Sequence, residues 1–270
     1  MTSADKLFSG SIPEFYDTYM VPLIFQAYAE DMAARVASVG PMSVLETAAG
    51  SGVVPRALIK HLRPDARYVV TDLSQPMLDH AAKRQPPDTR IEWRQADALN
   101  LPFEDDSFEV VLCQYGAMFF PDRAKGYSEA RRVLKTGGSF FFSVWDKIEN
   151  NEFANVVSHA AATVFPDNPP QFMSRTPHGY FDHDQIRADL NRAGFSEASI
   201  LRKEETSRGP SARQVATAYC QGTPLRGEIE ARDPNALQHV TDVAADALEA
   251  RYGTGPIAGK ICAHIVTAIK

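Results

Sequence analysis

The stretch "VLETAAGSGVVPRAL", Val44–Leu58, joins a short apolar run to a glycine-containing turn and then to an amphipathic pattern. The run "SVLET" predicts a strand, and the apolar residues from Ser51 to Leu62 fall on one face of a predicted helix. A strand that passes through such a turn into a helix is a common place for a ligand held against the backbone. The chemistry of that ligand decides the function.

The composition indicates a globular chain with an ordinary core. Of the 270 residues, 44% are hydrophobic and 23% charged, which is enough for one large α/β domain or a domain with an insertion. The formal net charge of -6 argues against a general nucleic-acid binder. The start, "MTSADKLFSGSIPEF", lacks the apolar core of a signal peptide, and no stretch approaches the roughly 18 apolar residues of a membrane span. The three cysteines are scattered, so we expect a cytoplasmic protein in a reducing compartment.

Strand and helix patterns alternate through the first half of the chain. The strand segments read "RYVVTD", "RIEWRQ", "FEVVLCQ" and "SFFFSVW", and the third is apolar through its middle, as in a strand covered on both faces. The segments "SQPMLDHAAKR" and "RAKGYSEARRVL" are helical, and Gly137-Gly138 is expected to break the chain before the last of these strands. This alternation predicts parallel βαβ units in a doubly wound α/β sheet.

The flanking regions have other patterns. Residues 12–39 predict two helices with Pro22 between them, and residues 149–164 predict a further helix. Residues 165–181, "FPDNPPQFMSRTPHGYF", are rich in proline and aromatic residues without a clear period, and we interpret them as a long functional loop. Residues 211–252 are helical and lie between two more strand segments, "EASILRKEE" and "KICAHIVTAI".

One cluster of histidine and aspartate residues could be read as a metal site. His178 and His183 stand close together in the sequence, with Asp182 and Asp184 beside the second. Asp182 is also placed to cap a short helix, because Gln185 stands three residues on. Capping accounts for this aspartate, so we predict no metal.

The residue before the glycine turn distinguishes between ligands. Glu46 places an anion at the end of the first strand, where it would repel a pyrophosphate and attract a ligand that carries an ammonium and a sulfonium. S-adenosylmethionine carries both. A dinucleotide fingerprint GxGxxG that starts at Gly50 would need its third glycine at Pro55, and proline does not replace that glycine easily.

Acidic residues also follow the next two strands. Asp72 ends the second strand, twenty residues after Gly52, where a carboxylate can accept hydrogen bonds from both ribose hydroxyls. Asp97 follows the third strand and can accept from an adenine amino group, while the backbone N–H of Ala98 can donate to a ring nitrogen. Together with Glu46, these residues match the methionine, ribose and adenine parts of one ligand.

This ordered set resembles the class I S-adenosylmethionine-dependent methyltransferases, of the small-molecule type close to the ubiquinone/menaquinone methylases. The resemblance covers roughly residues 44–145 and rests on "VLETAAGSG", "VVTDLSQPMLDHA", "QADALNLPFEDDSFEVVLCQYGAMFFPD" and "EARRVLKTGGSFFFSVW". It implies a Rossmann-like seven-stranded sheet, mostly parallel with an antiparallel last strand. It also implies S-adenosylmethionine as cofactor and S-adenosylhomocysteine as product.

The turn departs from the family pattern at one position. The family pattern is acidic-x-Gly-x-Gly-x-Gly, and Ala48 stands at the first glycine. Alanine is harmless there if its φ is negative, whereas a positive φ would put the cofactor affinity in doubt.

The resemblance also divides the single domain, residues 1–270, into parts. Residues 1–40 look like the family's helical cover, and residues 43–145 are expected to form the cofactor core. Residues 147–181 and 211–252 are expected to be insertions that cap the substrate side.

Two sets of site residues follow from the strand ends and the resemblance. The predicted cofactor-binding residues are Glu46, Ala48, Gly50, Gly52, Asp72, Leu73, Met77, Asp97, Ala98 and Gln114. The predicted substrate-binding residues are Tyr16, Tyr19, Tyr115, Phe172 and His178, over the end of the fourth strand. Met77 fits core packing equally well, and the two N-terminal tyrosines fit either helix packing or a lid over the cofactor.

The implied reaction is in-line transfer of a methyl group to a small, partly hydrophobic acceptor. A cationic leaving group needs no acid, so alignment and exclusion of water can supply most of the catalysis. A general base is needed only if the nucleophile holds a proton; His178 and Tyr16 are candidates, and the sequence places neither. Two alternatives stay open, namely a nicotinamide-dependent oxidoreductase on the same sheet and a non-catalytic S-adenosylmethionine-binding regulator.

Overall fold

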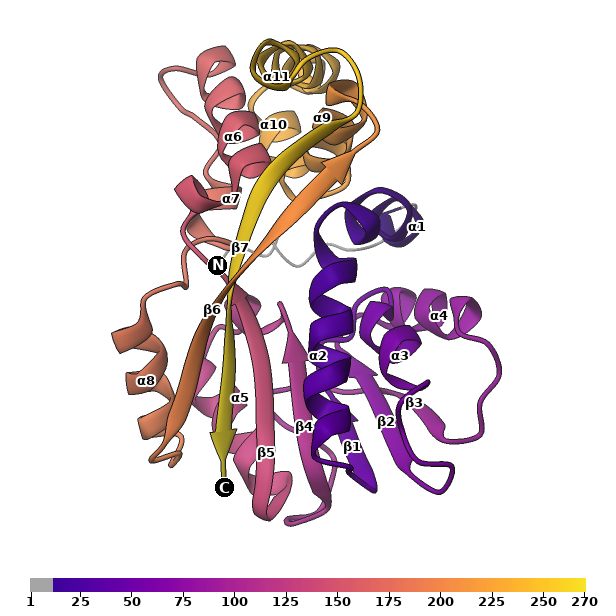
Figure 1. Ribbon diagram of the computed structural model, residues 1–270. Coiled ribbons are helices and arrows are strands. Elements are labelled where there is room, and N and C mark those ends of the chain that lie inside the picture. Colours follow the sequence, from indigo (N-terminus) through magenta and orange to yellow (C-terminus); the bar gives the residue numbers. More distant parts are fainter. Residues whose placement is uncertain (1–11) are drawn as a thin grey trace.

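A seven-stranded sheet organises residues 12–270, the part of the chain that the computed structural model describes (Figure 1). The strands are β1 (Ser43–Glu46), β2 (Arg67–Asp72), β3 (Ile91–Gln95), β4 (Phe108–Gln114), β5 (Leu134–Trp145), β6 (Ala198–Gly209) and β7 (Ile257–Ile269). They lie in the order β3-β2-β1-β4-β5-β7-β6. β1 to β5 are parallel, and β7 is antiparallel to both β5 and β6. The predicted α/β fold, a seven-stranded sheet that is mostly parallel with an antiparallel last strand, is therefore confirmed.

Helices cover both faces of the sheet (Figure 1). α2 (Gln26–Ser38), α3 (Val53–Leu58) and α4 (Gln75–Arg84) lie on one face. α5 (Arg123–Val133) and α8 (His183–Arg192) lie on the other. This double cover explains why β4 is apolar through its middle, because both of its faces are buried.

The remaining helices form a cap above the carboxyl ends of the parallel strands (Figure 1). α6 (Glu152–Val164) and α7 (Phe172–Arg175) come from the segment between β5 and α8. α9 (Ala212–Gln221), α10 (Leu225–Arg232) and α11 (Leu237–Tyr252) come from the segment between β6 and β7. α11 packs against both α9 and α6, so the cap joins two insertions that are distant in the sequence.

A long ribbon of β6 and β7 connects the sheet to the cap. β7 pairs with β5 only over Ala263–Ile269, whereas its pairing with β6 continues as far as Gly209 and Ile257. The part of the ribbon beyond β5 twists towards α9 and α11 (Figure 1). Two-stranded ribbons twist more strongly than wide sheets, so the ribbon can turn the cap over the strand ends.

The N-terminal helices differ from the sequence prediction. α1 (Ile12–Phe15), a π-helix (Tyr16–Phe25) and α2 follow one another directly, and Pro22 lies inside the π-helix. The expectation of two helices separated at Pro22 is wrong. Proline lacks the N–H that an α-helix would use here and clashes with the preceding turn, so the regular α pattern gives way to a π pattern.

Two element boundaries also differ from the prediction. The helix expected from Ser51 to Leu62 spans only α3, which ends at Leu58. Gly137-Gly138 does not break the chain before a strand but lies within β5, where the pairing with β4 shifts register. Glycine at positive φ allows an irregularity inside a strand as well as a break between elements, and sequence does not distinguish the two.

The cap region is more finely divided than predicted. Residues 165–181 contain α7 and are therefore not wholly a loop, and residues 211–252 form three helices instead of one stretch. The predicted cap of α8 is confirmed, since Asp182 Oδ1 accepts from the Gln185 N–H at 2.9 Å. No helix among residues 12–270 has both the length and the apolar character to span a membrane.

Candidate active site

Left-handed residues shape the turn between β1 and α3. Ala48, Gly50 and Gly52 have φ values of +54°, +57° and +80°. A Cβ at Gly52 would lie 2.8 Å from the Cβ of Ala81 on α4, so close packing also requires glycine there. The Gly52 N–H donates to the Ala49 carbonyl at 3.0 Å, which closes the turn. The turn therefore presents its backbone to the space beyond the end of β1.

Ala48 adopts the positive φ that the sequence left open. A left-handed conformation costs a residue with a Cβ about 1–2 kcal/mol. The Ala48 methyl group faces Gly116, where an added Cβ would overlap with it. Glycine at position 116 therefore makes room for the methyl group that replaces the family's first glycine.

Asp72 lies at the end of β2 and is only 8% exposed. Its Oδ2 accepts from the Gly50 N–H at 2.8 Å, and its Oδ1 accepts from the Ser74 N–H at 2.7 Å. Burial raises the pKa of Asp72, and these two N–H donors oppose that rise. A carboxylate has about four lone-pair sites, so Asp72 can also accept from hydroxyl groups of a ligand.

Glu46 ends β1 and is almost fully buried. The Tyr68 hydroxyl donates a hydrogen bond to its Oε2. Burial raises the pKa of Glu46 to about 8, even though the Tyr68 bond acts to lower it. A nearby cation favours the ionised form of such a carboxyl, so Glu46 suits the ammonium group of a ligand.

Two buried polar atoms beside these carboxyls have no hydrogen-bond partner within residues 12–270. They are Ser51 Oγ and Gln114 Oε1. The Gln114 amide is held from its other side, since Nε2 donates to the Phe25 carbonyl at 3.4 Å. Unpaired buried polar atoms are costly, and a ligand with donor groups would satisfy them.

The far end of the site is formed by Asp97 and its neighbours. Asp97 Oδ1 accepts from the Leu99 N–H at 2.9 Å, and Asp97 forms an isolated bridge with Asn100. Leu73 is 54% exposed at the rim, which is unusual for a leucine between two ordered elements. Met77 is buried on α4 and also lines the site, so it can serve both core packing and contact with a cofactor.

These residues enclose a cavity of about 410 Å³ along the carboxyl ends of β1 to β4, which we call the cofactor cavity. Its lining includes Glu46, Ala48, Gly50, Asp72, Leu73, Met77, Asp97, Ala98 and Gln114. Gly52 is the one predicted cofactor residue that does not line it, because it serves the turn. The buried carboxyls at one end, the free acceptor sites of Asp72 and the apolar wall at Met77 fit S-adenosylmethionine.

The π-helix is tied to this cavity by charged groups. Asp17 is buried and accepts from Arg56 Nη2 at 2.6 Å and from Arg84 Nε at 3.1 Å. Arg56 also donates to the Ser51 carbonyl at 2.7 Å, within the glycine turn. The link holds Tyr16 at the wall of the cofactor cavity.

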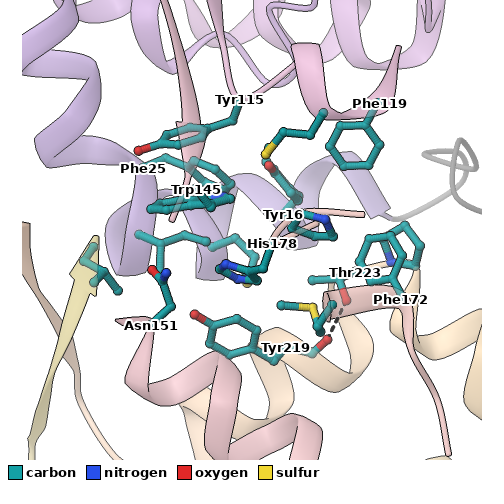
Figure 2. Close-up of a pocket in the computed structure, with 17 residues that line it drawn as sticks. Tyr16, Phe25, Tyr115, Phe119, Trp145, Asn151, Phe172, His178, Tyr219 and Thr223 are labelled. Carbon is teal, nitrogen blue, oxygen red and sulfur yellow. Dashed lines mark hydrogen bonds between the residues drawn. The ribbon is translucent and has the colours of Figure 1, made fainter. Parts of the chain in front are cut away.

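A second, smaller cavity of about 50 Å³ lies beneath the cap, and we call it the aromatic cavity (Figure 2). It is lined by Tyr16, Met20, Ile24, Phe25, Tyr115, Met118, Phe119, Trp145, Asn151, Phe172, Met173, Pro177, His178, Tyr219, Thr223, Pro224 and Ile261. Tyr16, Phe25, Tyr115 and Phe119 line both cavities. The two cavities are therefore neighbours that share an aromatic wall.

Tyr115 is a strained part of that wall. Its φ is +54°, an unfavourable value for an aromatic residue. Its ring stacks on Trp145 with the centroids 3.9 Å apart and the planes at 9°. Strain of this kind costs about 1–3 kcal/mol and is typical of functional sites. The strained residue directly follows β4, the strand over whose end the substrate was expected.

The predicted substrate residues fall into two groups. Tyr16, Tyr115, Phe172 and His178 line the aromatic cavity. Tyr19 lines neither cavity, and its ring packs on Phe15 with the centroids 4.4 Å apart, so the structure gives it the packing role.

Sequence reasoning missed several lining residues. Trp145 could have been found, because it ends β5 beside the strand that carries Tyr115. Phe25 and Tyr219 gave no signal, since each reads as an ordinary apolar residue of a helix.

Comparisons with known proteins agree on the class. The methyltransferase domain family matches residues 45–142. A demethylmenaquinone methyltransferase of Chlorobaculum parvum is 39% identical over 171 residues, covering 58% of this chain and 67% of that protein. A demethylmenaquinone methyltransferase of Clavibacter sepedonicus is 40% identical over 103 residues, covering 38% of this chain and 41% of that protein. The chain belongs to the S-adenosylmethionine-dependent methyltransferases, and its cofactor is S-adenosylmethionine.

A solved structure supports the fold over the whole chain. An N-methyltransferase of Haemonchus contortus, solved in complex with S-adenosylhomocysteine, superposes with a TM-score of 0.60 at 16% identity. The superposition covers 100% of this chain and 61% of that one. The match to the Clavibacter relative spans less than half of that protein's length, so the relatives' names leave the acceptor of this chain open.

Proposed function

We propose that the chain transfers the methyl group of S-adenosylmethionine to a compact, largely apolar small molecule in the aromatic cavity. The observation that carries the proposal is the wall of Tyr16, Phe25, Tyr115 and Phe119, which belongs to both cavities. A methyl group at that wall would leave the cofactor cavity and enter the aromatic one. The cap insertions and the N-terminal helices enclose the acceptor in this proposal.

The lining supports an acceptor with a flat apolar body. Aromatic and other apolar side chains supply most of the walls, and the described lining residues include no lysine, arginine, aspartate or glutamate. A nucleic acid would need clustered basic residues, so it is a poor fit. One relative is named as a methyltransferase of 2-phytyl-1,4-beta-naphthoquinone, which makes reduced naphthoquinones and related rings the first acceptors to test.

The protein contributes alignment and exclusion of water to the proposed reaction. Bound S-adenosylmethionine supplies an electrophilic methyl group on a cationic sulfur. The buried carboxyls of Glu46 and Asp72 hold its polar ends, and the stacked pair of Tyr115 and Trp145 fixes the wall through which transfer occurs. Orientation of two reactants can contribute about 7–11 kcal/mol in favourable cases.

A pair of variants tests the assignment of the two cavities. Phe172 is buried and lines only the aromatic cavity, whereas Tyr16 lines both. We therefore expect Phe172→Ala to impair methyl transfer while leaving S-adenosylhomocysteine affinity unchanged, and Tyr16→Ala to affect both. Calorimetry gives the affinity, and mass-spectrometric detection of the methylated ring gives the transfer. Unimpaired transfer in Phe172→Ala would rule out the aromatic cavity as the acceptor site.

The same assay separates the two alternative functions. Binding of NAD in preference to S-adenosylhomocysteine would support an oxidoreductase. Tight binding of S-adenosylhomocysteine without turnover of any ring acceptor would support a non-catalytic binding protein.

A further inference from the structure

Among the described residues that line the aromatic cavity, His178 is the one histidine. It lies between α7 and α8, is 5% exposed, and its backbone N–H donates to the Met173 carbonyl at 3.0 Å. Its ring lies near that of Trp145, with the centroids 6.2 Å apart. Figure 2 shows the ring projecting into the space between Trp145, Tyr16 and Tyr219.

The hydrogen bond of His178 fixes which nitrogen carries the proton. Nδ1 lies 2.8 Å from the backbone carbonyl oxygen of Asp146. A carbonyl oxygen only accepts, so Nδ1 is the protonated nitrogen and Nε2 holds a lone pair. Burial lowers the pKa of His178 to about 4, against the raising effect of the Asp146 bond, so the ring is neutral near pH 7. Within residues 12–270 Nε2 has no hydrogen-bond partner.

Two other polar side chains at this end of the cavity, Asn151 and Thr223, already have partners. Asn151 Nδ2 donates to the carbonyls of Asp146 and Lys147, and Asn151 Oδ1 accepts from the Cys262 N–H. Thr223 Oγ1 donates to the Tyr219 carbonyl at 2.8 Å. A ligand group with an O–H therefore finds a free basic acceptor at His178 Nε2.

We propose that His178 is a catalytic residue that accepts the proton of a hydroxyl group on the methyl acceptor, which makes the acceptor a phenol-type ring methylated on oxygen. This inference rests on the proposed function, and it assigns the substrate class of the same site.

The step balances in atoms and charge. The O–H bond breaks, its proton moves to His178 Nε2, and its electron pair stays on oxygen and forms the bond to the methyl carbon. The carbon–sulfur bond breaks with its pair left on sulfur. One positive charge is lost at sulfur and one appears on the imidazole, so the buried site gains no net charge.

Groups beside His178 offset part of the cost that burial places on the protonated ring. Its Nδ1–H keeps the bond to the Asp146 carbonyl, and the Asp146 carboxylate acts on the ring through its charge. Although burial acts to raise it, the Arg202 and Lys147 donors hold the pKa of Asp146 at about 2, so this carboxylate is ionised. Glu149 also acts on the ring in the same direction.

Two variants separate proton acceptance from packing. His178→Asn keeps a donor for the Asp146 carbonyl and removes the Nε2 acceptor. His178→Gln places an amide oxygen near the Nε2 position, which accepts a hydrogen bond but is not basic. His159→Asn is the matched control, because His159 Nδ1 also lies 2.8 Å from a backbone carbonyl oxygen, that of Asn155, but this histidine is exposed on α6 and lines neither cavity.

Binding gives the first readout. Calorimetry on protein saturated with S-adenosylhomocysteine measures the affinity for 4-methylphenol, whose O–H can donate a hydrogen bond to His178 Nε2. One neutral hydrogen bond is worth up to about tenfold in affinity. We expect that loss in His178→Asn, little loss in His178→Gln and none in His159→Asn. Equal affinity in His178→Asn and wild type would overturn the proposal.

Transfer rate gives the second readout. General base catalysis contributes about 10²–10⁴-fold. We expect both His178 variants to lose that factor with 4-methylphenol, and far less with 4-nitrophenol at a pH where it is ionised. An equal loss with both phenols would make His178 a structural residue. With 4-methylphenol, the transfer rate of the wild type should show a normal solvent deuterium isotope effect, and the rates of the His178 variants should not. Absence of the effect in the wild type would contradict proton transfer.

The outcome also separates this inference from the proposed function. Methylation of amines or thiols but of no phenol would overturn the inference and leave the proposed function standing. Failure to methylate acceptors of any class, with S-adenosylhomocysteine still bound, would overturn both.

Discussion

The cofactor cavity and the aromatic cavity share a wall but differ in how the chain builds them. Except for Tyr16 and Phe25, the described residues that line the cofactor cavity come from positions 46–121, mostly from strand ends and the turns after them. The aromatic cavity takes its lining from the N-terminal helices, the ends of β4 and β5, the cap and β7. The shape of the cofactor cavity therefore depends on local backbone structure, whereas the shape of the aromatic cavity depends on how distant segments pack.

The largest expected effect lies on the cofactor side, at Asp72. Asp72→Ala removes acceptors for two ribose hydroxyls, each charge-assisted bond being worth about 1.5–3 kcal/mol. We expect the Kd for S-adenosylhomocysteine to rise by about 10² or more. Calorimetry measures this, with denaturant unfolding as a control for the lost bonds to Gly50 and Ser74. The Kd of Asp72→Asn should fall between those of the wild type and Asp72→Ala. An unchanged affinity in Asp72→Ala would refute the ribose contact.

The junction of the two cavities should be sensitive to one added methyl group. In Gly116→Ala the new Cβ would overlap with Ala48 Cβ and lie 2.8 Å from Cys113 Sγ. Overpacking of this kind costs about 1–3 kcal/mol, measured as the free energy of unfolding. Adding Ala48→Gly removes the first overlap and should restore part of the loss. Strictly additive effects of the two substitutions would show that the two residues do not compete for space.

The ionisation of Glu46 should make cofactor affinity depend on pH. Its pKa is raised to about 8, and a bound ammonium group favours the ionised form, so affinity should rise with pH and level off above about 8. Where one proton is released, the rise is at most about tenfold per pH unit. S-adenosylhomocysteine titrations from pH 6 to 8 measure the slope. Glu46→Gln should reduce this dependence of affinity on pH. Asp72, whose pKa is also raised, can maintain part of the dependence. Equal slopes in both proteins would remove Glu46 from the ammonium site.

The smallest effect is expected at Ala48. Relief of its positive φ in Ala48→Gly gains about 1–2 kcal/mol, and the added freedom of the unfolded chain costs about 0.5–1 kcal/mol. We expect a gain in unfolding free energy of about 1 kcal/mol or less, with no loss of cofactor affinity. A destabilised variant would show that the Ala48 methyl group packs usefully against Gly116.

The same contrast explains what the sequence could and could not predict. Glu46, Asp72 and Asp97 were found because parallel strands end at one edge, so alternating patterns alone place their side chains together. The sheet followed from the same patterns. The π-helix at Pro22 was not predictable, since proline more often ends a helix than lies within a π pattern.

The aromatic cavity shows the limit of local reasoning. Phe172 and His178 were found through the composition of their segment, whereas Tyr219 reads as a core residue of α9. Its place in the lining depends on where the β6–β7 ribbon positions α9, and no local sequence pattern predicts that position. Sequence could not choose between helix packing and a lid for Tyr19, because the π-helix changes which side chains face the cavity.

The central claim is that the cofactor methyl group points from one cavity into the other. A crystal structure with S-adenosylhomocysteine tests it directly. The account predicts the ribose hydroxyls on Asp72, the amino group beside Glu46 and the sulfur atom against the wall of Tyr16 and Tyr115. A ligand bound with its sulfur at the Asp97 end, or outside the cofactor cavity, would contradict it.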